Sequence, residues 1–73
     1  MNKPKRKKFV GIAKVRERSE TRFVKYRFND CANFITWLQR SYEVLYVNIY
    51  NNREPNKGMQ VAGWTKKQGY YDL

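Results

Sequence analysis

The sequence predicts an α+β fold of two layers, in which an antiparallel sheet of three to four strands carries one helix packed on one face. Two patterns support this fold class. Residues 45–50 alternate aliphatic Leu, Val and Ile with Tyr, Asn and Tyr, which is the period of a strand. One apolar stripe with helical spacing is formed by Cys31, Phe34, Ile35, Leu38 and Tyr42. A chain of 73 residues has room for one such core.

The first two elements are expected to be strands. Residues 9–16 and 21–28 are rich in Val, Ile, Phe and Tyr, which favour strands. The polar segment 17–20 between them predicts a hairpin loop, although it lacks the Asn-Gly or Asp-Gly pair typical of tight hairpins. Arginines and glutamates alternate around this loop, so ion pairing is expected there.

A helix and two further strands follow. Asn29 or Asp30 is a suitable N-cap, because either side chain accepts hydrogen bonds from the unpaired amides of a first turn. The helix leads to a strand at 45–50, a loop rich in Asn, Pro and Gly at 51–58, and a fourth strand at 59–65. The predicted order is therefore strand, strand, helix, strand, strand.

The chain divides into three segments by composition. Residues 1–8 hold five of the sixteen basic residues and no apolar anchor, which predicts a flexible basic arm. Residues 9–65 form the single predicted domain. Residues 66–73 are a C-terminal tail without a secondary-structure assignment, whose Tyr70 and Tyr71 could fold over the sheet as a lid.

The charge balance indicates a polyanionic partner. Sixteen Lys and Arg stand against six Asp and Glu, which gives a net charge of +10. Such an excess in a short chain destabilises the fold by self-repulsion unless a partner offsets it. Nucleic acid is the expected partner, and an acidic protein surface is the second.

Several function classes lack their residues in this chain. Histidine is absent, and no paired carboxylates, glycine-rich phosphate loop or zinc-ligand spacing occurs. We therefore expect no enzymatic activity, no metal and no cofactor. The single cysteine, Cys31, forms no intrachain disulfide and is expected as a core residue of a cytoplasmic protein. No apolar run approaches the roughly 20 residues that span a bilayer, so no membrane association is expected.

Strand alternation predicts a functional face. One helix covers one side of the sheet and leaves the other free. In the second strand the inward residues would be Val24, Tyr26 and Phe28. In the fourth strand the inward residues would be Met59 and Val61. The free face would then carry Phe23, Lys25, Arg27, Tyr46, Tyr50 and Trp64.

This mixture of rings and cations suits nucleic acid. Unstacked bases stack on aromatic rings while cations hold the phosphates, and the same face could instead enter a duplex major groove. Outside the face, the predicted nucleic-acid-binding residues are Lys3, Lys5, Arg6, Lys7 and Lys8 of the arm, Arg53 and Lys57 of the long loop, and Lys66 and Lys67 after the last strand. The sequence does not distinguish DNA from RNA, or single-stranded from double-stranded nucleic acid, as the partner.

A protein-interaction module is the alternative prediction. The aromatic face could bind an acidic host protein as an inhibitor, or form a homodimer, since Trp, Tyr and Arg dominate binding energy at interfaces. Small size and a Lys- and Asn-rich composition suit an accessory protein of a phage or another mobile element.

Overall fold

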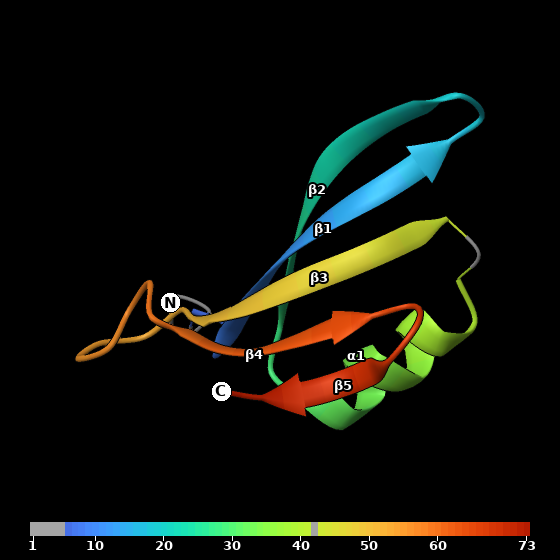
Figure 1. The fold of residues 1–73 in the computed structure, drawn as a ribbon. Coiled ribbons are helices and arrows are strands. Elements are labelled where there is room, and N and C mark those ends of the chain that lie inside the picture. Colours follow the sequence, from blue (N-terminus) through green and yellow to red (C-terminus); the bar gives the residue numbers. More distant parts are fainter. Residues whose placement is uncertain (1–5, 42) are drawn as a thin grey trace, which may run out of the picture.

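The chain folds into a five-stranded antiparallel sheet with one helix on one face (Figure 1). The computed structural model describes residues 6–41 and 43–73. The elements are β1 Phe9–Glu17, β2 Glu20–Phe28, α1 Cys31–Gln39, β3 Val44–Asn51, β4 Gln60–Thr65 and β5 Gly69–Asp72. The strand order in the sheet is β2-β1-β3-β4-β5. The predicted α+β class is confirmed, and the sheet has one strand more than expected.

The β1–β2 hairpin closes through two residues. Glu17 and Glu20 are the last paired positions, so Arg18 and Ser19 form the turn, with Arg18 at a φ of 59°. Arg22 Nε lies 3.3 Å from Glu17 Oε2, which confirms the expected ion pairing near the loop. The Arg22 and Glu17 side chains are 64% and 55% exposed, so the pair contributes only about 0–1 kcal/mol.

The helix begins at its predicted cap and packs through the middle of the predicted stripe. Cys31, expected in the core, is only half-buried, and Tyr42 lies outside the described residues. Asp30 is the N-cap, and its Oδ1 accepts a hydrogen bond from the backbone N–H of Asn33 at 3.2 Å. Phe34 and Leu38 are buried on the stripe. The Phe34 ring stacks on Phe28 of β2 with centroids 4.0 Å apart, which ties the helix to the second strand.

The core lies between the helix and the middle of the sheet. Its buried residues are Ala13, Val15, Phe34, Leu38, Val44, Val47, Ile49, Ala62 and Trp64. Gly11 lets the layers approach, because a Cβ there would lie 3.0 Å from Val47 Cγ1 and 3.3 Å from both phenylalanine rings of the stack. In the described part of the chain, no helix is long and apolar enough to cross a bilayer.

The C-terminal tail supplies the fifth strand. Lys66–Gln68 turns the chain back, Gly69 takes a φ of 83°, and the Gln68 N–H donates to Thr65 Oγ1 at 3.0 Å. Residues 69–72 then pair with β4 at the edge of the sheet. The tail backbone therefore extends the sheet and does not fold over the open side as a lid.

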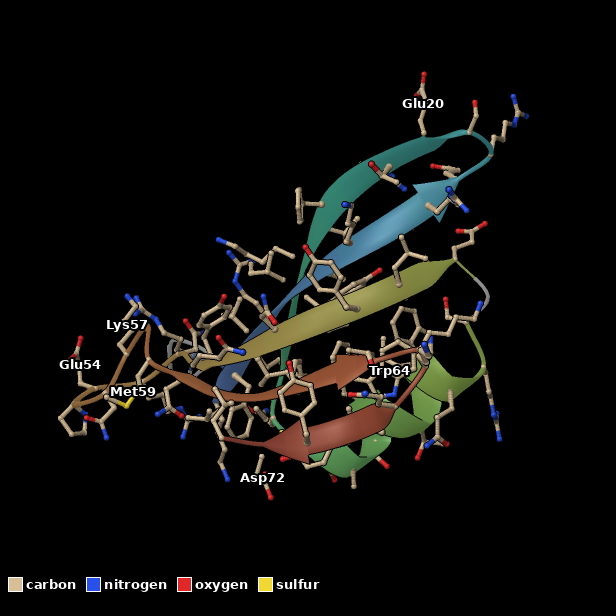
Figure 2. All side chains as sticks on the ribbon, viewed as in Figure 1. Glu20, Glu54, Lys57, Met59, Trp64 and Asp72 are labelled. Atoms are coloured by element: carbon tan, nitrogen blue, oxygen red, sulfur yellow. The ribbon has the colours of Figure 1, made fainter. Side chains whose placement is uncertain are left out.

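The predicted side-chain directions in the fourth strand are wrong for two residues. Ile49 pairs with Ala62 and Tyr50 pairs with Gln60, so Val61 is an extra residue at a β-bulge. The bulge shifts the alternation, and Trp64 opposite Val47 is turned to the helix with 3% exposure. Met59, expected in the core, precedes the strand and is 58% exposed on the β3–β4 loop (Figure 2). Val61 packs partly buried against the core.

Candidate nucleic-acid interface

The side of the sheet away from the helix is organised in rows across the strands. The helix side is fixed by the buried residues Ala13, Val47, Ile49 and Ala62, so their strand neighbours point the other way. We call this other side the open face. Its rows are Phe23–Lys14–Tyr46–Thr65, Lys25–Ile12–Asn48–Gly63–Tyr71 and Arg27–Val10–Tyr50–Gln60, with Arg16–Thr21 beyond the first row.

Five of the predicted face residues lie on the open face. Phe23 is 65% exposed, and Lys25 and Arg27 beside it on β2 are also exposed. Tyr46 and Tyr50 are half-buried on β3. The predicted directions of these side chains are confirmed, because β2 and the paired part of β3 keep a regular two-residue alternation.

Trp64 does not belong to the open face. It packs in the core between the sheet and the helix. Its indole N–H is buried without a hydrogen-bond partner in the described part of the chain. A ring with 3% exposure has no surface on which a base can stack, so the prediction that Trp64 lies on the free face is wrong.

Most strand cations lie on the open face. It carries Lys14, Arg16, Lys25 and Arg27, whereas Arg22, the one described strand cation on the helix side, is paired with Glu17. The carboxylates of the described strands, Glu17, Glu20 and Asp72, all stand at positions of the helix side. The open face therefore has four cationic strand positions and, within the described strands, no acidic one. Lys14 was missed by the sequence reasoning, although its place in the β1 alternation with Ile12 would have located it.

Tyr71 adds a fourth ring to this surface. It pairs with Gly63, and a Cβ at Gly63 would collide with the Tyr71 ring, so the ring lies directly over the glycine. Sequence reasoning missed this residue because the tail had no assigned strand and thus no alternation. The open face consequently presents the rings of Phe23, Tyr46, Tyr50 and Tyr71 among its cations.

The base of the basic arm is attached to one end of the sheet. The Lys8 N–H donates to Asn29 Oδ1 at 2.9 Å, and the buried Asn52 donates from Nδ2 to the Lys7 carbonyl at 3.0 Å. Arg53 donates from Nε and Nη2 to the Arg6 carbonyl at 2.9 and 2.7 Å. These bonds fix where the arm leaves the domain, beside the row that contains Arg27 and Tyr50.

The other predicted cations are distributed around this arrangement. Arg6, Lys7 and Lys8 are exposed, whereas Lys3 and Lys5 lie outside the described residues. Arg53 has a structural contact that sequence reasoning did not expect. Exposed Lys57 stands on the β3–β4 loop (Figure 2). Exposed Lys66 and Lys67 stand on the β4–β5 turn, at the opposite end of β4. The structure thus brings Lys25 and Arg27 together with the aromatic rings of the open face and places these loop lysines at the ends of the sheet.

Cys31 and Tyr70 are not activated as nucleophiles. Burial, together with Asp30 and Asp72, raises the pKa of the Cys31 thiol. A hydrogen bond to Asp72 raises the pKa of Tyr70 to about 12. Both groups are therefore protonated near neutral pH. Among the described residues, no three His, Cys, Asp or Glu side chains are grouped as metal ligands.

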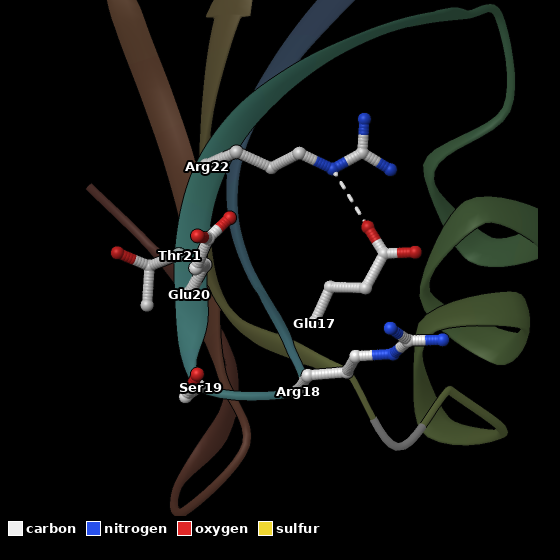
Figure 3. A pocket seen from close by; sticks show the side chains of 6 residues that line it. All are labelled: Glu17, Arg18, Ser19, Glu20, Thr21 and Arg22. Carbon is white, nitrogen blue, oxygen red and sulfur yellow. Dashed lines mark ion pairs between the residues drawn. The ribbon is translucent and has the colours of Figure 1, made fainter.

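The hollow at the end of the β1–β2 hairpin is polar. It is lined by Glu17, Arg18, Ser19, Glu20, Thr21 and Arg22 (Figure 3). The Arg22–Glu17 ion pair lies within it, and both signs of charge are present. This end of the hairpin therefore lacks the single-sign charge found on the open face.

Comparison with known proteins found no match: no protein-family model, no curated protein and no solved structure matches this chain. A proposal for its function therefore depends on the geometry and charge of the open face.

Proposed function

We propose that this protein is a non-catalytic nucleic-acid-binding module that uses the open face of its sheet and the base of its arm. The observation that carries the proposal is the segregation of charge. Lys14, Arg16, Lys25 and Arg27 occupy one side of the sheet, and the strand carboxylates occupy the other. A polyanion approaching the open face therefore meets cations without opposing carboxylates at the described strand positions.

The rings on the same face favour nucleic acid over other polyanions. Phe23, Tyr46, Tyr50 and Tyr71 share their rows with the cations or lie in adjacent rows. Phosphates need only the cations, whereas bases gain stacking energy from rings placed beside those cations. The exposed residues Arg6, Lys7 and Lys8 extend the positive surface from the Arg27 end of the sheet.

Binding measured against salt concentration tests this proposal. Arg27→Gln and Arg40→Gln each remove one exposed positive charge, but Arg40 is the C-cap of α1 and lies outside the open face. We expect Arg27→Gln to weaken binding of a fluorescent oligonucleotide. We also expect it to reduce the slope of log affinity on log salt by about 0.7–0.9.

The matched Arg40→Gln variant should leave both quantities close to those of the unchanged protein. Fluorescence anisotropy at several salt concentrations measures them. Equal effects of the two substitutions would show that net charge matters and the open face does not. Absence of binding at low salt would refute the function itself.

The alternative function is a protein-interaction module, whose partner is an acidic protein surface or a second copy of this chain. The exposed Phe23 beside Lys25 and Arg27 would suit such an interface, because apolar and arginine side chains anchor protein contacts. Light scattering of the protein, together with an oligonucleotide shift assay at two salt concentrations, separates the two proposals. A homodimer that ignores oligonucleotides at low salt, and that Phe23→Ser converts to a monomer, would favour this alternative.

A further inference from the structure

The width of the sheet bears on which form of nucleic acid fits the open face. Five strands spaced about 4.8 Å apart place the outer backbones about 19 Å from each other. The major groove of B-DNA is about 12 Å wide and admits a helix or a two-stranded ribbon. The open face is therefore too wide to enter the groove, which removes the duplex mode that the sequence left open for a narrower sheet.

The projecting end of the β1–β2 hairpin is the two-stranded part of the sheet. Pairing of β1 with β3 ends at Val15 and Val44, and the hairpin continues beyond it (Figure 1). The hollow at this end is lined by Arg18 and Arg22 together with Glu17 and Glu20, so its formal charges cancel. Glutamates placed toward phosphates oppose binding, and the hairpin end is thus a poor ribbon for a duplex groove.

Rings on a surface five strands wide suit bases that are not paired. Lys14 stands between Phe23 and Tyr46 in one row, so the backbones of Phe23 and Tyr46 are two strand spacings, or about 10 Å, apart. Phe23 is 65% exposed at the side of the sheet. In a duplex the base faces are covered by their neighbours, so these rings would find no partner there.

We infer that the nucleic acid bound by the open face is single-stranded, with bases stacked on Phe23 and Tyr46 and phosphates held by Lys14 and Lys25. This inference rests on the proposed function and narrows its substrate class. Stacking of this kind tolerates any base, because every base has a flat π-face, so weak sequence preference is expected.

Substitution of Phe23 separates stacking from charge. Phe23→Leu keeps an apolar side chain at an exposed strand position but removes the flat ring, and Phe23→Tyr restores it. We expect Phe23→Leu to weaken binding of a fluorescent 12-nucleotide oligothymidine by about 5- to 150-fold, the range that corresponds to loss of one base–ring stack. Phe23→Tyr should bind as the unchanged protein does.

The same anisotropy titrations with a 12-base-pair duplex complete the test. We expect the duplex to bind more weakly than oligothymidine at equal salt and to be insensitive to Phe23→Leu. Duplex binding as tight as single-strand binding, or equal loss on both probes, would overturn the inference. If Arg27→Gln still weakens binding in that case, the proposed function stands; if it has no effect, both proposals fail.

Discussion

Replacing Trp64 tests whether this ring belongs to the core or to the open face. Trp64 is 3% exposed and packs with the buried residues under the sheet. Truncation of such a ring to Ala typically costs about 3–5 kcal/mol of folding free energy. A 73-residue domain has roughly 4–11 kcal/mol in total, so Trp64→Ala should remove a large part of its stability.

Trp64→Phe and Trp37→Ala provide comparisons for the loss of folding free energy expected of Trp64→Ala. Trp64→Phe keeps most of the packing and removes a buried N–H that lacks a partner in the described chain, whose burial costs about 1–3 kcal/mol. The loss of ring volume opposes this gain, so the net change should be well below that of Trp64→Ala. Trp37, which is 47% exposed and contacts Tyr26 with ring centroids 5.1 Å apart, is the exposed control.

Urea denaturation followed by circular dichroism measures the three free energies of unfolding. The expected order of destabilisation places Trp64→Ala well above Trp37→Ala. Binding of oligothymidine by the folded fraction of Trp64→Phe should be unchanged. If Trp64→Ala costs less than about 1 kcal/mol, a value typical of a surface change, the described packing of β4 is wrong. Loss of oligothymidine binding by a fully folded Trp64→Phe variant would show that the Trp64 ring is part of the interface.

Three other substitutions test local features. Asp30→Ala should cost about 0.5–2 kcal/mol in urea denaturation because it removes the N-cap of α1, and Asp30→Asn should restore most of it. The absorbance titration of Tyr70 should show a pKa of about 12, and Asp72→Asn should lower this pKa. Because the pKa of Tyr70 is raised in the folded state, its hydrogen bond to Asp72 stabilises the fold below pH 10, and this stabilisation is lost as pH rises to about 12. Gly63→Ala should displace the Tyr71 ring, seen as amide shifts on β5, whereas an unmoved ring would contradict the close contact.

Regular alternation explains what the sequence could predict. The helix stripe, its Asp30 cap and the two faces of β2 follow from local spacing alone, because each pattern continues over several residues without interruption. The same alternation located Phe23, Lys25 and Arg27 on one face. Their binding of nucleic acid stays a prediction.

Tertiary contacts explain what the sequence could not predict. β5 is four residues long and contains no aliphatic residue, and the structure shows it as a strand through its pairing with β4. The bulge opposite Tyr50 reverses the directions expected in β4, and no turn residue marks it. Arg53 contacts the Arg6 carbonyl from 47 residues away, and such a partner has no local signal.

The unequal distribution of charge on the two sides of the sheet also bears on how fast a ligand associates. Among the described strand residues, four cations lie on the open face, and three carboxylates with the single cation Arg22 lie on the other side, so the strands contribute an electric dipole directed across the sheet. The field of a polyanion exerts a torque on that dipole at a distance of about one Debye length, about 8 Å at physiological ionic strength. The protein would thus rotate its cationic side toward the ligand before contact, so a larger fraction of collisions would be productive and the association rate would fall as salt is added.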